Sequence, residues 1–344
     1  MTNAYISLFS GAGGLDLGLT RAGLAPALLC DENRAACDTL QAAFPRPATA
    51  MLTDIHDLLN AGTIPAVSRP APVLVAGEPP LVGTAGTAPV VNPDGDVPQL
   101  LYRFMDAVGQ ARPDAFAMVS VAALNNSRWE AVMFRLRSTA RELGYDTFTP
   151  VFDAADYGTA QHRERLVLVG MPKGCKPDAS VAAKKQKLSA GAALSALPGG
   201  TRDIPCPSGV GLTGKPVVRS SAYSGQLLSG TGRMLDLSRT APAVATGLGG
   251  NKTPVLDETQ LEFGATPWIE SYHQYLLGGG GPHTDLPPWV RMRRLSLREC
   301  AALQGFPPDY PFRGAAVSQF RLCGGAVPPG IGEAVGAGIL AGLA

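Results

Sequence analysis

The chain has 344 residues, a length that favours two domains, one of them an insertion, and its 41 Gly and 30 Pro indicate a globular protein with many turns. The 29 Lys and Arg almost balance the 28 Asp and Glu, so the net charge of +1 excludes an overall nucleic-acid signature and any basic surface must be local. The sequence also lacks an apolar run long enough for a membrane span, a secretory signal pattern and paired CxxC spacing among its six cysteines. We therefore expect a cytoplasmic protein with no metal site and no membrane contact.

The first 170 residues alternate short apolar runs with amphipathic segments, which predicts a parallel α/β sheet with ligands at the carboxyl ends of its strands. The predicted strands are residues 5–9, 27–30, 73–76, 115–119 and 165–170. Helices are predicted after the Gly-rich turn at residues 11–14, over residues 34–44 and 129–143, and near the C-terminus over residues 296–303 and 330–343. From about residue 176 to 288 the chain is rich in Gly, Pro, Ser and Thr and shows few clear helices, so we expect a second domain or a large insertion there.

Glycines and acidic residues in the first strands predict a cofactor site. A Gly-rich turn after the first strand lets the backbone and a helix N-terminus approach a ligand, and acids that end the second strand stand where a ribose would lie. The residues concerned are Gly11, Gly13, Gly14, Asp31, Glu32 and, after the third strand, Asp54. An ordinary tight turn with surface acids is the alternative interpretation.

An ordered series of motifs resembles the cytosine-5 DNA methyltransferase family. FSGAGGLDLG (residues 9–18) is similar to the family's first motif, and DENRAACDTL and TDIHDL resemble its second and third. DAADYGTAQHRERLVLVG (153–170), RRLSLRECAALQGFP (293–307) and GGAVPPGIGEAVG (324–336) resemble its eighth, ninth and tenth. The resemblance implies an α/β fold: a doubly wound, mostly parallel methyltransferase (Rossmann-like) sheet with a smaller, irregular target-recognition-type domain.

The same resemblance implies domain boundaries, a cofactor and a partner. The cofactor-binding domain would span residues 1–178 and the target-recognition-type domain 179–290, and the ninth and tenth motifs would fill 291–344, the last helix packing back on the first domain. The cofactor would be S-adenosylmethionine and the partner double-stranded DNA. By motif match, Phe9 would contact the adenine or the methionine arm, and Gly11 and Gly13 would pass close to the methionine. Asp31 or Glu32 would hold the ribose, and the acid after the third strand would lie near the adenine amino group.

The chain departs from the family where the chemistry is done. In the family, a cysteine in GGPPC adds to carbon 6 of a flipped cytosine, while the glutamate of a Glu-Asn-Val sequence supports protonation at N3. Here GEPPL places Leu81 at the nucleophile's position, and FAMVSVAAL places Val119 at the acid's and Ser120 at the asparagine's. Gly325 replaces an asparagine of the tenth motif. Losing the nucleophile costs about a millionfold in rate and losing the acid about 10²–10⁴-fold, so we expect no intact catalytic residue.

Rescue by another thiol is not expected, because no other cysteine stands on a comparable turn. The cysteines considered are Cys30, Cys175, Cys206 and Cys323. The stretch from Arg69 to Arg103 also holds no Lys or Arg between its ends, so a loop there would gain little from closing over DNA phosphates.

Gln161-x-Arg163-x-Arg165 of the eighth motif is retained, and its two arginines form the family's Arg-x-Arg pair. It would either contact a base or phosphate, as in the family, or form a structural ion-pair site with Asp156 or Glu164.

Cations of the second half predict a DNA-binding surface, because phosphate-contacting loops need a local positive excess. The candidates are Arg219, Arg233, Arg239, Lys252, Arg291 and Arg293. A solvated basic surface or a protein-docking face is the alternative, and the KKQK run at residues 184–187 is interpreted as a solvated linker.

Three functions follow from these observations, in order of preference. The first is a non-catalytic methyltransferase homologue that binds S-adenosylmethionine and DNA and acts as a regulatory or partner subunit, its partner an active methyltransferase or another protein. The second is an active DNA cytosine-5 methyltransferase that uses an unidentified nucleophile or a partner chain. The third is an S-adenosylmethionine-dependent enzyme with different chemistry, for which Glu78, where the family usually has glycine, is the only positive hint.

Overall fold

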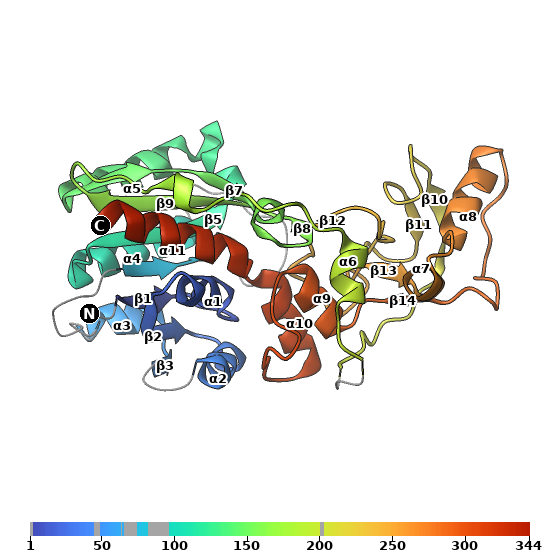
Figure 1. Ribbon diagram of the computed structural model, residues 1–344, viewed down its shortest axis with the longest axis horizontal. Helices are drawn as coiled ribbons and strands as arrows, with labels where there is room; N and C mark the ends of the chain where they lie inside the picture. The colour runs from blue at the N-terminus through green and yellow to red at the C-terminus, as the bar shows by residue number, and fades with distance from the viewer. Residues whose placement is uncertain (1–2, 45–48, 63, 65–73, 82–95, 200–202) are drawn as a thin grey trace.

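The largest element of the molecule is a mostly parallel sheet (Figure 1). The computed structural model describes residues 3–44, 49–62, 64, 74–81, 96–199 and 203–344. Among those residues the sheet has eight strands in the order β3-β2-β1-β4-β5-β9-β6, with β7 also paired to β9. Their bounds are β1 (Ala4–Leu8), β2 (Ala25–Asp31), β3 (Thr49–Leu52), β4 (Leu74–Gly77), β5 (Ala115–Val121), β6 (Tyr145–Phe148), β7 (Val151–Asp153) and β9 (Glu164–Pro172).

Strands β1 to β5 pair in parallel, whereas β9 runs antiparallel to β5, β6 and β7. The predicted doubly wound, mostly parallel fold is confirmed, with an antiparallel edge that the alternation of strands and helices did not indicate. The central strands β4 and β5 are short apolar runs buried along almost their whole length, as expected where helices cover both faces.

Two hydrophobic cores fill the two faces of this sheet. One holds side chains of α1 (Gly14–Arg21), α2 (Arg34–Ala43) and α11 (Pro329–Leu343), and the other those of α3 (Ile55–Asn60), α4 (Asp96–Ala111) and α5 (Glu130–Glu142). Strand β5 supplies alternate residues to each, Val119 to the first and Met118 to the second. The last helix therefore packs back beside the first motif, as the resemblance implied.

Helix α1 packs so closely against α11 and the segment just before it that only glycine fits at two positions of the first helix. A Cβ added at Gly14 would lie 2.1 Å from the carbonyl oxygen of Val327, and one added at Gly18 would lie 2.1 Å from that of Pro329. The glycines of the first motif thus serve helix packing as well as the turn.

The rest of the chain is a smaller, irregular part built on short sheets, as predicted. Strands β10 (Leu212–Val217) and β11 (Gln226–Leu228) pair with each other, β12 (Ala241–Pro242) pairs with β8 (Gln161–His162), and β13 (Val255–Asp257) pairs with β14 (Met292–Arg294). The helices are α6 (Ala190–Ser195), α7 (Glu258–Phe263), α8 (Trp268–Leu277), α9 (Leu297–Leu303) and α10 (Ala316–Gly325). In Figure 1 α8 and β10 lie at the end farthest from the main sheet, with α9 and α10 in between.

A third core joins these parts, because its side chains come from residues on either side of both predicted boundaries. The division into 1–178, 179–290 and 291–344 stays a prediction. Within the described part of the chain no single helix is long and apolar enough to cross a membrane, although α10 and α11 together reach that length and composition across a 42° bend.

Candidate functional site

The loops after β1, β2 and β3 meet at one edge of the sheet and bring the predicted cofactor residues together. The Ser10 amide donates to the carbonyl of Cys30 at 3.0 Å, and the Thr53 amide donates to that of Asp31 at 3.1 Å. The Gly11 amide donates to Asp31 Oδ2 at 2.8 Å, which fixes the Gly-rich turn against the end of β2. Asp54 follows at the N-terminus of α3, where its carboxylate caps the helix by accepting from the His56 amide.

The glycines of this turn have different surroundings. Phe9, Gly11 and Gly13 all have positive φ, of 54°, 55° and 77°. A Cβ at Gly13 would collide with Phe44, whereas a Cβ at Gly11 would meet nothing within 4 Å. Gly11 therefore faces open space that a ligand can occupy, while Gly13, like Gly14, is required by the packing behind the turn.

Of the two acids at the end of β2, Asp31 is directed toward the turn. Its carboxylate accepts from the amides of Gly11 and Asn33, and burial raises its pKa above the ordinary value despite those two bonds. Glu32 is exposed. The ribose role predicted for Asp31 or Glu32 stays a prediction, and the geometry favours Asp31.

The positions expected to carry the nucleophile and the acid are apolar and packed. Leu81, directly after the turn that follows β4, is 8% exposed and belongs to the core with Phe104 and Met118. Val119 is fully buried opposite Val167 of β9. At Gly325 an added Cβ would meet nothing within 4 Å, so the position that carries asparagine in the family is open. Val82 and the stretch to residue 95 lie outside the described residues.

The cysteines near this edge are poorly suited to act as thiolates. Cys30 and Cys323 are buried, and burial raises the pKa of each thiol to about 12. Cys300 is buried as well, with its pKa well above the ordinary value for the same reason. Cys175 and Cys206 are half-buried, on segments away from the turn after β4.

The two retained arginines bind protein groups other than those suggested by the sequence. Arg163 is buried and donates to the carbonyls of Val244 and Gly324 at 3.0 and 2.9 Å. Arg165 Nε donates to Glu78 Oε1 at 2.9 Å, and its Nη1 donates to the carbonyl of Glu164 at 3.1 Å. The prediction that Asp156 or Glu164 would supply the carboxylate for these arginines is therefore wrong. Asp156 instead pairs with Lys184 and Lys187 of the KKQK run, whose side chains are 71% and 52% exposed, so the run is solvated as predicted and tied to the protein at Asp156.

Gln161 was singled out in the sequence, but the buried polar network that it forms beside Arg163 was not predicted. Gln161 Nε2 donates to Gln304 Oε1 at 2.8 Å, Gln161 Oε1 accepts from the Val244 amide at 2.9 Å, and Gln304 donates to the Cys323 carbonyl. Gln161 was the sequence feature that could have indicated this network, because a buried side-chain amide needs hydrogen-bond partners within the protein.

The predicted DNA-contacting cations separate into two sets. The first set is exposed and has no ion pair among the described residues; we call its members the open cations: Arg219, Arg233, Arg239 and Lys252. Arg291 and Arg293 instead bind carboxylates, Arg291 contacting Glu262 through two nitrogens and Arg293 contacting Glu299 in the same way. Both side chains form bidentate ion pairs with carboxylates of the same chain while remaining 47% and 40% exposed, so a phosphate would have to displace a carboxylate to bind either of them. Contact with DNA stays a prediction for all six residues.

A family model described as C-5 cytosine-specific DNA methylase matches residues 4–203 and 249–341. The chain belongs to this family.

Relatives of this methylase-family chain align with nearly all of it. The type II methyltransferase M1.HphI of Haemophilus parahaemolyticus is 25% identical over 99% of the chain and 87% of its own length. M.FnuDI of Fusobacterium nucleatum is 26% identical over 94% and 90%. The crystal structure of S. pombe Dnmt2 methyltransferase matches with a TM-score of 0.62 at 14% identity, covering 99% of this chain and 97% of that one, which supports the shared fold.

S-adenosylmethionine is the cofactor expected for the family, and the edge above β1 and β2 fits it. The open space at Gly11 can admit a ligand next to the backbone, and the Asp31 carboxylate stands beside that turn. Asp31 is thus an acidic group in direct contact with the backbone of this turn, whereas burial raises the pKa of the neighbouring Cys30 thiol to about 12.

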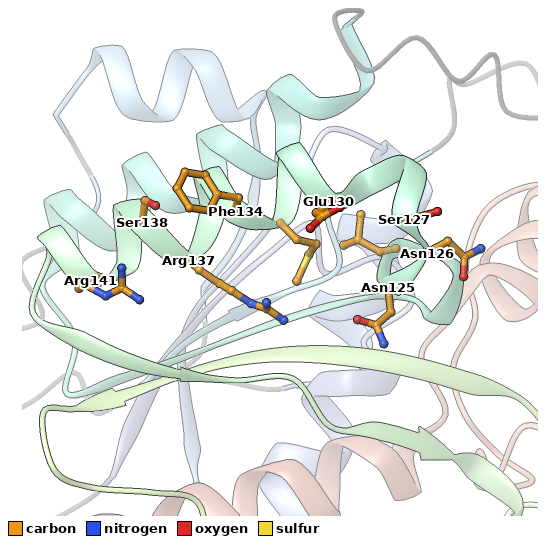
Figure 2. Close-up of a pocket in the computed structure, with 10 residues that line it drawn as sticks. Asn125, Asn126, Ser127, Glu130, Phe134, Arg137, Ser138 and Arg141 are labelled. Atoms are coloured by element: carbon orange, nitrogen blue, oxygen red, sulfur yellow. The ribbon is translucent and has the colours of Figure 1, made fainter.

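A separate cavity of about 410 Å³ opens on the outer side of α5 and on the turns that follow β5. Figure 2 shows the Arg137 side chain reaching from α5 toward Asn125, with Phe134 and Ser138 on the same helix. None of the residues predicted for cofactor, base or DNA binding lines this cavity.

Proposed function

We propose that this member of the cytosine-5 methylase family binds S-adenosylmethionine and double-stranded DNA but does not methylate cytosine on its own. It would act as a regulatory or partner subunit, beside an active methyltransferase or another protein. The proposal concerns activity and partners, which the family assignment leaves open.

The observation that carries the proposal is the state of the turn after β4. Leu81 stands at the nucleophile's position, has no lone pair or acidic proton, and packs into the core below the sheet edge. In the buried cysteines Cys30, Cys37 and Cys323 burial raises the thiol pKa to about 12, 11 and 12, so the thiolate fraction at neutral pH is negligible in each. Val119 adds the absence of a carboxylate at the acid's position.

When bound, S-adenosylmethionine would supply an electrophilic methyl group. In this chain Phe9 and Gly11 would line its methionine and adenine, Asp31 would accept from the ribose hydroxyls, and Asp54 would lie near the adenine amino group. These residues would bind and orient the cofactor; with leucine at position 81 and valine at position 119, neither of these two positions can activate carbon 5 of cytosine.

The test uses the pure chain, labelled S-adenosylmethionine and a duplex library of random sequence in which cytosine is replaced by 5-fluorocytosine. We expect cofactor and DNA binding without a covalent adduct or a transferred label. The matched control is the double variant Leu81→Cys, Val119→Glu, in which a trapped adduct shows that the assay detects the chemistry. An adduct formed by the unaltered chain would overturn the proposal.

A second candidate is an active methyltransferase that uses another nucleophile or a partner chain. The observation that favours it is the set of relatives named type II methyltransferases, which align with nearly the whole chain. Under this candidate, methyl transfer would appear when the chain is combined with proteins encoded beside it. This candidate would be favoured if the pure chain transfers methyl groups. It would also be favoured if the chain does so together with a partner that is inactive alone.

A further inference from the structure

Helix α5 exposes a large apolar side chain on the outer side of the helical layer that covers one face of the main sheet. The helix is anchored by Val132 and Leu136, which are buried in the core that it shares with α3 and α4. Phe134, by contrast, is 70% exposed. Single exposed apolar residues are common on protein surfaces, so Phe134 indicates a binding surface only if the groups around it do so as well.

The cavity of about 410 Å³ beside Phe134 combines an apolar floor with cationic walls. Leu124 and Met133 line it and are buried, whereas Arg137 and Arg141 line it from positions one helical turn apart. Figure 2 shows these two arginines and Phe134 along the same helix. Such a hollow fits an apolar side chain whose neighbours accept hydrogen bonds from guanidinium groups.

The arginines of this helix have no carboxylate to bind. The segment 125–142 holds four arginines against two glutamates. Among the described residues no carboxylate forms an ion pair with any of the four. Arg137 and Arg141 are four residues apart, a spacing at which like charges destabilise a helix. Their positive charge is therefore unneutralised on the surface and available to an acidic partner. The four are Arg128, Arg135, Arg137 and Arg141.

A second cavity, of about 390 Å³, lies on the other flank of the same helix. It is lined by Thr139 and Leu143 together with residues of α3 and α4. Positions 139 and 143 are about half a turn around the helix axis from 137 and 141, so α5 forms a ridge between two hollows. On this flank the Arg135 guanidinium lies 4.0 Å from the centre of the Tyr102 ring of α4. Contacts on both flanks are more than a single small molecule would need.

We propose that α5 docks an acidic segment of a partner protein, with an apolar side chain of that segment seated beside Phe134. Arginine and aromatic residues are the types enriched at the centres of protein interfaces. A second copy packed symmetrically would bring the same arginines together, and a duplex would offer phosphates but no side chain for the apolar floor. The inference rests on the proposed function, in that the partner is the protein beside which this chain would act.

The test selects a random peptide library, displayed on phage, on the unaltered chain. We expect enriched peptides to carry Asp or Glu on both sides of a Leu, Phe or Trp, and their affinity to fall as salt is added. The double variant Phe134→Ser, Arg141→Glu should bind synthetic copies of these peptides about tenfold or more weakly, the loss that one central interface residue gives. Fluorescence anisotropy with labelled peptides measures the affinities.

The matched control is the double variant Phe263→Ser, Arg21→Glu. Phe263 is 74% exposed, on α7 of the smaller part. Arg21 is exposed and, like Arg141, is the basic residue in the last turn of its helix, but α1 covers the opposite face of the main sheet. The control should bind the peptides as tightly as the unaltered chain.

The proposal is overturned if no peptide is enriched, if the enriched peptides lack acidic residues, or if the folded Phe134→Ser, Arg141→Glu variant binds them unchanged. Self-association of the unaltered chain that this variant loses, seen by sedimentation, would make a second copy the occupant instead. Thermal unfolding checks the fold, and if the double variant fails to fold, Phe134→Ser alone takes its place.

Binding of S-adenosylmethionine and of a labelled duplex by the same variants keeps this surface distinct from the proposed function. Both should be unchanged in Phe134→Ser, Arg141→Glu, and a loss of duplex affinity there would make the surface a nucleic-acid contact and overturn the docking proposal. A covalent adduct formed by the unaltered chain on fluorocytosine DNA would overturn the proposed function and leave the peptide result standing.

Discussion

Asp16 is a carboxyl group enclosed in the packing between α1 and the sheet. It is fully buried, and burial raises its pKa from 3.8 to about 7, an effect larger than the opposing influence of the nearby Ser7 and Tyr5 hydroxyls. Because the folded protein holds the proton more tightly than the unfolded chain, the contribution of Asp16 to stability is present below about pH 4. It is lost as the pH rises to about 7, by an amount on the order of 4 kcal/mol.

The Asp16→Asn variant should remove this dependence. We expect the free energy of unfolding of the unaltered protein to fall between pH 5 and pH 8 relative to that of the variant, which carries no ionisable group there. Urea unfolding at several pH values measures both curves. Asp31, whose pKa is also raised, is present in both proteins, and because its charge helps to raise the pKa of Asp16 the difference between the curves reports Asp16 together with that interaction. If the two curves run parallel, Asp16 does not change its ionisation in the folded protein between pH 5 and pH 8, which would contradict the prediction.

Gly11 and Gly14 stand three residues apart and should respond oppositely to alanine. At Gly14 the added Cβ would lie 2.1 Å from a backbone oxygen, so Gly14→Ala should unfold the protein or lower its stability by several kcal/mol. In Gly11→Ala the new Cβ enters open space, so the stability cost is only the about 1–2 kcal/mol of a non-glycine residue in the left-handed region. The same Cβ would occupy the space proposed for S-adenosylmethionine, so we expect most cofactor binding to be lost. Thermal unfolding with and without cofactor separates the two. If S-adenosylmethionine raises the unfolding temperature of Gly11→Ala as much as that of the unaltered protein, the cofactor binds at another place.

At the scale of elements, Arg163 clamps three segments that are distant in sequence. It joins the start of β9 to the segment after β12 through Val244 and to the end of α10 through Gly324. Arg163→Met should leave two buried carbonyls without a donor and lower the free energy of unfolding by about 2–4 kcal/mol. The exposed Arg239→Met is the control and should change stability by less than about 0.5 kcal/mol. Denaturant unfolding measures both, and equal effects would argue against the clamp.

The elements that the sequence predicts are those with strong local patterns. Strands β1, β4 and β5 are apolar runs, and α5 and α11 are found within a residue of their expected ends. Helices α4 and α8 were not predicted, because each lies in or beside a Gly- and Pro-rich stretch that indicates loops. The partner of Arg165 was not predictable either. Glu78 lies 87 residues away, and only the order of strands brings the two together.

At the scale of the whole molecule, a net charge near zero conceals an uneven distribution of cations. Many arginines and lysines form ion pairs with carboxylates of the same chain, among them Arg291, Arg293 and the lysines that bind Asp156. The open cations are concentrated in the smaller part, between residues 219 and 252. Sequence alone could count these charges but could not tell the two sets apart, because the difference lies in which carboxylates the fold places beside them.

The open cations therefore make a quantitative prediction for DNA binding. Each phosphate contact contributes about 0.9 to the slope of log affinity against log salt concentration, so changing all four to glutamine should reduce that slope by about 3.6. The double variant Arg291→Gln, Arg293→Gln is the matched control: it breaks ion pairs with Glu262 and Glu299, so it should lower stability and leave the slope nearly unchanged. Fluorescence anisotropy with a labelled duplex between 50 and 200 mM salt, a range over which about 6–10 contacts would change affinity by orders of magnitude, measures both slopes. If the unaltered chain and the fourfold variant have equal slopes, the open cations do not contact DNA phosphates. If the control variant loses more of the slope than the fourfold variant, Arg291 and Arg293 contact the DNA instead.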